Sequence, residues 1–316
     1  MKNLVLMLFL SIAGTACGQM KYTRSTPIDL TGAHDLVISG KQINGGNRDC
    51  IRLKDCRNVH ITRCLLENSD KVGILLENCT NVLIDSCYIA NVQTGVNAKH
   101  SVTVKVNRNH FLNMNGPFPA GCAVQFNDVS APASQINYNR VMNIKGEAKH
   151  PQDLLSVYKS NGIEGDSIQV IGNWIRGGQV INDSGGAAGI VLGDVGGSYQ
   201  VARNNIVING GFVGMQVQGG SHIKMDHNTI YSSRTEYSND GLSYGNYSDL
   251  PSEDVEISYN KVRFFDRNGK ENNAWWDPKT VSKPKGWETN ILGADIDEKV
   301  LPEKLFERRK GDDRKR

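Results

Sequence analysis

A short pattern recurs along most of the chain, and this repetition limits the possible folds more than any other feature. The segment Asn58–Leu66 returns 23 residues later as Asn81–Ile89, with the same alternation of apolar and polar residues. Further copies follow at intervals of 22 to 34 residues, with asparagine in place of the central cysteine. A repeat of this length predicts a solenoid, in which each turn packs only against its neighbours. The equivalent positions are Cys64, Cys87, Asn109, Asn139, Asn173, Asn204, Asn228 and Asn260.

Each repeat holds short segments whose apolar residues lie two apart, as in Ile51–Leu53, Ile74–Leu76 and Val96–Ala98. This is the period of a strand, whereas a helix would need a spacing of three to four residues. Strands of successive turns would stack about 4.8 Å apart, and loops of variable length would be inserted at one corner. Equivalent side chains would then share one environment, which predicts a ladder of stacked asparagines and cysteines.

This arrangement resembles the right-handed parallel β-helix superfamily, which includes pectate and alginate lyases. The resemblance covers roughly residues 30–280. It implies an all-β, single-stranded, right-handed parallel β-helix of about nine turns, with an Asn/Cys ladder and long loops at one corner. We predict a signal peptide at 1–17, an N-terminal linker or cap at 18–30, the β-helix at 31–285, and a closing segment with a disordered basic tail at 286–316.

The first residues predict export. Lys2 precedes the apolar run Leu4–Leu10, and small residues then lead to Cys17. The segment Gly14–Cys17 resembles a bacterial lipobox, so Cys17 is a candidate for lipid attachment; ordinary signal-peptidase cleavage at the same bond is the alternative. We therefore expect a periplasmic protein, or an outer-membrane or cell-surface lipoprotein, of a Gram-negative bacterium, which contacts a membrane only through such a lipid.

The distribution of charge excludes a nucleic-acid partner. The net charge is +3, and the tail Glu307–Arg316 alone carries that excess, so the folded body is close to neutral. A nucleic-acid-binding fold needs a basic stripe on its own surface. We therefore expect a monomer whose partner is a polysaccharide.

Six cysteines follow the leader, and in an exported protein they would suggest disulfides. However, Cys56 and Cys79 are 23 residues apart, as are Cys64 and Cys87, and this is the interval of the repeat. The pattern favours stacked, buried thiols. Disulfides stay open as an alternative, because stacked Cα atoms lie within bonding range. The six residues are Cys50, Cys56, Cys64, Cys79, Cys87 and Cys122.

Two features place a candidate site on the outer face of the middle turns. Outward positions after the second strand of each repeat form a polar row, and most of its titratable members are in the middle turns. Four long insertions lead into the same region, and we expect them to form the sides of a groove. They lie at 114–121, 144–153, 177–188 and 232–240. The row is Asp55, Asn78, His100, Asp128, Lys159, Asp194, Gly219 and Asn246.

β-Elimination of a uronate needs a neutralised carboxylate, a base and an acid. Lys159 is the candidate base, and Tyr158 or His150 is the acid or an alternative base. Arg176, or alternatively Arg203, is a bidentate partner for a carboxylate. We predict Ca²⁺ as a candidate cation, because three carboxylates offer the oxygen ligands it prefers. These are Asp128, Asp153 and Asp194. The candidate substrate-binding residues are Asn127, Gln125, Gln218 and His100. A surface charge ladder without catalysis is the alternative interpretation of Lys159 and these aspartates.

Signature motifs of several β-helix families are absent, including the Gly-His-Gly of polygalacturonases and the Trp-Ile-Asp-His of the major pectate lyases. The sequence is most similar to the group that includes chondroitinase-B-like alginate lyases, which use a lysine and an arginine; Lys159 matches the lysine. The resemblance implies a polysaccharide lyase acting on an acidic, uronate-containing polysaccharide. The alternatives are a uronan C5-epimerase and a non-catalytic cell-surface protein that binds glycans.

Overall fold

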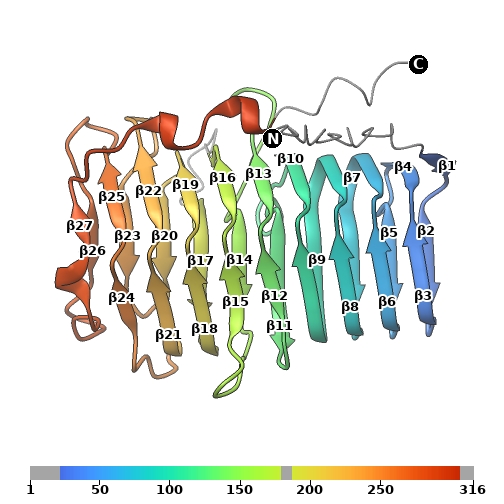
Figure 1. Ribbon diagram of the computed structural model, residues 1–316, viewed down its shortest axis with the longest axis horizontal. Helices are drawn as coiled ribbons and strands as arrows, with labels where there is room; N and C mark the ends of the chain where they lie inside the picture. The colour runs from blue at the N-terminus through green and yellow to red at the C-terminus, as the bar shows by residue number, and fades with distance from the viewer. Residues whose placement is uncertain (1–21, 179–186, 307–316) are drawn as a thin grey trace, which may run out of the picture.

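The computed structural model describes residues 22–178 and 187–306. The predicted signal peptide, Cys17, the basic tail and most of the loop at 177–188 lie outside these residues. The strands wind into an elongated coil, shown with its long axis horizontal in Figure 1. Each strand pairs in parallel with its equivalents in neighbouring turns, which confirms the predicted parallel β-helix. Within the described part, no helix has the length and apolar character needed to cross a membrane.

The coil has three long faces, each formed by stacked strands, and β7 (Leu65–Glu77) and β9 (Tyr88–Asn107) run around corners from one face to the next. Sheet 1 contains β1 (Thr23–Ser25), β4 (Lys41–Gly46), β7, β9, β10 (His110–Met114), β13 (Arg140–Met142), β16 (Trp174–Arg176), β19 (Ile206–Ile208), β22 (Thr229–Ser232), β25 (Lys261–Phe264) and β27 (Ile291–Leu292).

Sheet 2 carries the candidate site. It contains β2 (Ile28–Thr31), β5 (Ile51–Lys54), β7, β9, β11 (Val124–Ser130), β14 (Leu155–Tyr158), β17 (Ala188–Asp194), β20 (Val213–Val217), β23 (Asp240–Tyr244) and β26 (Ala274–Trp276). Sheet 3 contains β3 (His34–Ser39), β6 (Arg57–Thr62), β8 (Thr80–Asp85), β9, β12 (Gln135–Asn137), β15 (Ile168–Ile171), β18 (Ser198–Arg203), β21 (Ser221–Asp226) and β24 (Glu256–Ser258). Three short 3₁₀ helices follow: η1 (Trp287–Thr289), η2 (Glu298–Val300) and η3 (Glu303–Leu305).

Aliphatic side chains stacked along the inside of the coil form the core. In sheet 2, alternate residues point inward, as the two-residue period predicts. Each inward position pairs in register with its equivalent in the next turn, so apolar side chains form continuous columns. Outward side chains of the same strands are thereby aligned along the outer face. One fully buried column is Ile51, Ile74, Val96, Val124, Leu155, Ile190, Met215 and Leu242.

The predicted ladder is present, with one correction. Asn173 is fully buried, and its amide nitrogen donates to the side-chain oxygen of Asn205 at 2.9 Å. The ladder member is therefore Asn205, and not Asn204 as predicted; Asn204 lies at the corner with a φ of 56°. The ladder begins with cysteines, since the backbone N–H of Cys64 points at the sulfur of Cys87 at 3.4 Å. It continues beyond the predicted end to Asn290.

All six described cysteines are buried free thiols, as the repeat interval predicted. The sulfurs of Cys56, Cys64, Cys79 and Cys87 lie within hydrogen-bonding distance of backbone carbonyls of the preceding turn; that of Cys79, for example, points at the carbonyl of Leu53 at 3.4 Å. Burial raises the pKa of Cys50 to about 12, which keeps it protonated. These cysteines act as small apolar residues within the stack.

The C-terminal segment takes a path that the sequence did not indicate. Strand pairing continues to β27, and the chain then runs back along the outside of sheet 1, as the red segment in Figure 1 shows. Leu301 and Phe306 pack there on Ile208 and on neighbouring apolar side chains. At the other end, strand pairing begins at β1, within the segment predicted to be a linker or cap. Trp287 is buried and packs edge-on against Trp276.

Candidate functional site

The predicted polar row lies along the corner that follows sheet 2. Five of its members, including Lys159 and Asp128, adopt left-handed backbone conformations, with φ values of 49° for Lys159 and 58° for Asp128. Asp194 is not one of them: a register shift pairs it with Tyr158 at the end of β17, and Val195 takes the corner position with a φ of 52°. Asparagine and aspartate tolerate this conformation better than most residues, so the turn itself explains part of the polar character of the row. Neighbouring turns interact along the corner, because the side chain of Asn78 donates to that of Asp55 at 3.1 Å.

The structure brings three of the predicted residues together, and we call Tyr158, Lys159 and Asp194 the corner cluster. Tyr158 pairs with Asp194 in the register of β14 and β17. The backbone N–H of Lys159 donates to the carbonyl of Asp194 at 2.9 Å. The Lys159 ammonium lies 5.2 Å from the centre of the Tyr158 ring. An ammonium group, a phenol hydroxyl and a carboxyl thus share one small area.

Two carboxyl groups here are held partly protonated. Burial raises the pKa of Asp194 to about 6, against the opposing effect of Lys159. Burial also raises the pKa of Asp153 to about 7; the backbone N–H of Ala188, which donates to this carboxylate at 2.9 Å, lowers it, and the charge of Asp194 raises it. Both groups therefore exchange protons near neutral pH, as acid–base catalysis requires.

The other predicted catalytic residues lie elsewhere. Arg176 is on sheet 1, where its guanidinium contacts the carboxylate of Glu303 at 3.0 Å, that of Glu298 at 3.4 Å and the carbonyl of Leu301. It holds the C-terminal segment and is not available to a substrate on sheet 2, so its predicted role is corrected. His150 lies in the loop before β14, with its backbone carbonyl against Gly116 and Gly121.

The predicted substrate-binding residues are spread along sheet 2 and its corner. His100 is exposed and contacts Asp128 at 2.8 Å one turn away. Gln125 accepts a hydrogen bond from Asn97 at 3.2 Å. Asn127 pairs with Tyr158 in register, and so lies one turn from the corner cluster.

The three predicted calcium ligands do not converge. Within residues 22–178 and 187–306, no group of three or more His, Cys, Asp or Glu side chains is placed to hold a metal ion. Asp128 is an exposed corner residue engaged with His100. Asp153 and Asp194 are close enough for the charge of one to raise the pKa of the other.

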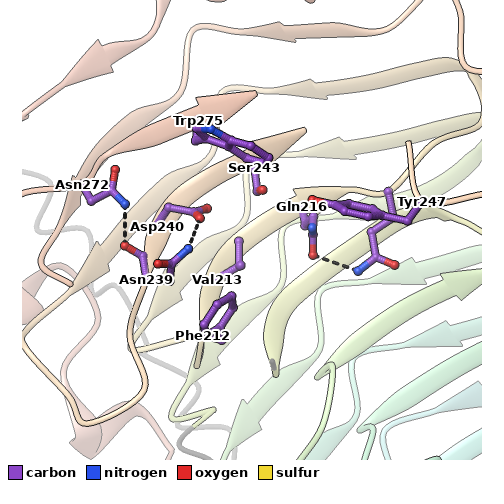
Figure 2. A pocket seen from close by; sticks show the side chains of 10 residues that line it. Phe212, Val213, Gln216, Asn239, Asp240, Ser243, Tyr247, Asn272 and Trp275 are labelled. Carbon is purple, nitrogen blue, oxygen red and sulfur yellow. Dashed lines mark hydrogen bonds between the residues drawn. The ribbon is translucent and has the colours of Figure 1, made fainter. Parts of the chain in front are cut away.

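A pocket of about 670 Å³ opens on the same sheet, at β20, β23 and β26. Figure 2 shows Asp240, Ser243, Gln216 and Trp275 around it. Its apolar walls are Phe212, Val213, Tyr247 and Trp275, and its polar groups come from Gln216, Gln218, Asn239, Asp240, Ser243 and Asn272. Gln218 was predicted as a substrate-binding residue, and the pocket contains it.

Asp240 is the unusual group in this pocket. It is 3% exposed, and its Oδ2 accepts a hydrogen bond from Asn239 at 2.6 Å. Its other oxygen, Oδ1, is buried without a hydrogen-bond partner in the described structure. Burial raises the pKa of this carboxyl to about 7. Sequence reasoning placed the insertion at 232–240 near the site but gave no role to its last residue, because burial by surrounding loops leaves no sequence pattern.

The buried carboxyl predicts a pH-dependent stability. Asp240 binds a proton in the folded state up to about pH 7, whereas in the unfolded chain it releases the proton near pH 4. The free energy of unfolding should therefore fall as pH rises through this interval, by at most about 4 kcal/mol from this group. Asp240→Asn removes the titration, so the variant should be more stable than the wild type at about pH 8 and similar to it at about pH 4.

Urea unfolding at both pH values measures the effect, and Asp249→Asn, at an exposed position, is the control. An equal stability difference between the Asp240→Asn variant and the wild type at both pH values would show that Asp240 does not titrate in this way.

The comparisons with known proteins agree with the architecture. The sequence matches the family model described as the right handed beta helix region over residues 26–191. Comparison with curated proteins gave no match. One similar solved structure is the enzymatically active domain of tailspike protein 2 from bacteriophage CBA120, with a TM-score of 0.53 and 10% identity over 82% of this chain. This chain spans only 41% of that tailspike chain.

A second similar structure is an alginate lyase from Paenibacillus sp. str. FPU-7. Its TM-score is 0.51, its identity is 16%, and the match covers 80% of this chain and 88% of that one. At these identities the likeness shows a shared fold and no more.

Proposed function

We infer the function from the premise that the chain belongs to the family of right-handed β-helix regions. We propose that it is a carbohydrate-active enzyme that cleaves a uronate-containing polysaccharide by β-elimination, with the chain of sugars lying along sheet 2. The observation that carries the proposal is the corner cluster, which places a lysine, a tyrosine and a protonatable carboxyl together. The likeness to an alginate lyase fold is consistent with this chemistry.

The dimensions of sheet 2 suit a polysaccharide. Its strands repeat about every 4.8 Å, which is close to the length of one sugar residue in an extended chain. Outward side chains of successive turns can therefore contact successive sugars. The corner cluster and the 670 Å³ pocket belong to the same sheet, so one extended substrate can reach both.

In the proposed β-elimination, each side chain of the site has one role. A protonated Asp194 or Asp153 donates a hydrogen bond to the uronate carboxylate, which makes the C5 proton more acidic. Lys159 takes that proton at its side-chain nitrogen. The electrons of the C5–H bond form the C4–C5 double bond, and the C4–O bond breaks. Tyr158 protonates the departing oxygen. The products are a shortened chain and a chain that ends in an unsaturated uronate.

Asp153 and Asp194 are the two predicted ligands close enough together to hold a calcium ion in common, and such an ion would supply the positive charge that neutralises the uronate carboxylate in place of a protonated acid. The two aspartates suit this role only when both are ionised, so cation and proton compete for them. A chelator therefore distinguishes the two cases, because it would abolish activity that depends on a bound cation and leave activity that depends on a protonated aspartate.

The test is the ultraviolet absorbance of the unsaturated uronate. The protein is mixed with alginate, pectate, glucuronan, glycosaminoglycans and an acidic heteropolysaccharide, with and without a chelator. We expect a steady rise on one of them. A flat trace on every substrate, with the folded state confirmed by circular dichroism, would refute the lyase assignment. An epimerase or a glycan-binding protein would then replace it.

A further inference from the structure

The pocket at β20, β23 and β26 differs in chemistry from the corner cluster. None of its ten lining residues is lysine, arginine or histidine. Its hydrogen-bonding groups are four amides, the hydroxyls of Ser243 and Tyr247, the indole N–H of Trp275 and the carboxyl of Asp240. A uronate carboxylate would therefore find no cation here, and it would have to approach the carboxyl of Asp240.

Further acidic groups strengthen the preference of the pocket for an uncharged ligand. Burial raises the pKa of the Tyr247 hydroxyl, and so do the charges of Asp240 and Asp277; hydrogen bonds from Gln216 and Ser243 oppose the rise. Tyr247 thus stays a neutral hydroxyl in an acidic environment. Above about pH 7, where Asp240 is ionised, a ligand that carries no negative charge avoids the repulsion that a uronate would meet.

The pocket also offers the two features that a sugar ring requires. Trp275 and Tyr247 are 42% and 58% exposed, so their ring surfaces are open to the C–H face of a sugar. Asp240 lines the pocket and is 97% buried, and one of its oxygens is buried without a hydrogen-bond partner in the described structure. Figure 2 shows its carboxyl pointing into the space between Val213, Ser243 and Gln216. A buried oxygen without a partner is stabilised strongly when it accepts a hydrogen bond, and a sugar hydroxyl can donate one.

We propose that this pocket binds an uncharged sugar residue, which stacks on Trp275 and donates a hydroxyl hydrogen bond to Asp240, with Gln216 and Gln218 as further partners. β23 lies three turns from β14, which corresponds to about 14 Å or roughly three sugars. If the proposed function holds, the substrate is then a heteropolysaccharide that presents a uronate to the corner cluster and a neutral sugar to this pocket. The binding itself does not depend on that function.

The test is equilibrium binding to the full chain, measured by isothermal titration calorimetry. The probes are hexasaccharides of the cellulose, xylan, mannan and galactan types, with an oligogalacturonate and a glucosamine hexamer as the charged arms. We expect saturable binding of at least one neutral probe, and at least tenfold weaker binding of the oligogalacturonate. Binding of no neutral probe, or tighter binding of the oligogalacturonate or the glucosamine hexamer, would overturn the proposal.

Variants locate the binding. Trp275→Ala and Asp240→Asn should each weaken it by about tenfold or more, and Gln218→Ala should weaken it less. Tyr259→Ala removes an aromatic side chain that is 56% exposed and stacked on His227 away from this pocket, so it should leave binding unchanged. Unchanged binding in folded Trp275→Ala and Asp240→Asn variants would refute the site.

The neutral-sugar pocket and the lyase assignment can be refuted independently of each other. Neutral-sugar binding without any unsaturated product would reject only the lyase assignment. Unsaturated product from a homopolymeric uronan, without neutral-sugar binding, would reject only this pocket.

Discussion

The Asn173→Leu variant should lose about 4 kcal/mol of its free energy of unfolding. The amide of Asn173 donates to the carbonyl of Ile136 and to the side chain of Asn205, at 2.8 and 2.9 Å. Its oxygen accepts from the backbone and the side chain of Asn139, at 2.9 and 3.1 Å. Leucine has a similar volume but can form none of these bonds, so several buried polar groups lose their partners at once.

Denaturant unfolding monitored by circular dichroism measures this loss, and Asn44→Leu, at an exposed position in β4, is the control. We expect the control to stay within about 0.5 kcal/mol of the wild type. If Asn173→Leu unfolds at the same denaturant concentration as the wild type, the ladder does not contribute as described.

The Lys159→Ala variant should lose about 10³-fold in kcat while keeping the stability of the wild type. Lys159 is exposed at the corner after β14, and its backbone N–H, which bonds to Asp194, is unchanged by the substitution. The loss should fall on kcat more than on KM, because the amine acts on the proton that leaves C5.

Lys99→Ala is the matched control. Lys99 pairs with Asn127 of the next turn, and Asn127 pairs with Tyr158 of the turn after that. Lys99 is therefore a lysine on the same sheet, two turns away from the corner cluster. The Lys99→Ala variant should retain activity close to that of the wild type. A folded Lys159→Ala variant with unchanged kcat would remove Lys159 from the mechanism and leave it a member of the surface charge ladder.

The sequence predicted most of the fold because a β-helix makes each turn an independent copy of the same pattern. Stacking gives equivalent residues the same environment, so the two-residue period and the Cys/Asn positions are visible without any long-range information. The error at Asn204 arose where two asparagines are adjacent. The spacing allows either residue, and only the hydrogen bond from Asn173 to Asn205 identifies the ladder member.

The site was predicted less completely, for two physical reasons. The corner cluster was visible because Tyr158 and Lys159 directly follow a recognisable strand, and Asp194 directly ends another. Arg176 was misplaced because its partners, Glu298 and Glu303, are more than 100 residues away and reach it only through the fold of the C-terminal segment. Asp240 was missed because its raised pKa comes from burial, which its own sequence neighbours do not encode.

Proton NMR of the reaction products tests the central claim, β-elimination on a uronate, most directly. The spectrum of a uronate polymer incubated with the protein reports chain cleavage, sugar configuration and double bonds together. The account predicts a new olefinic H4 signal of an unsaturated uronate, growing in step with the number of chain ends and absent with Lys159→Ala. New chain ends without the olefinic signal would mean hydrolysis. Changed ring configuration without new ends would mean epimerisation, and either result would contradict the account.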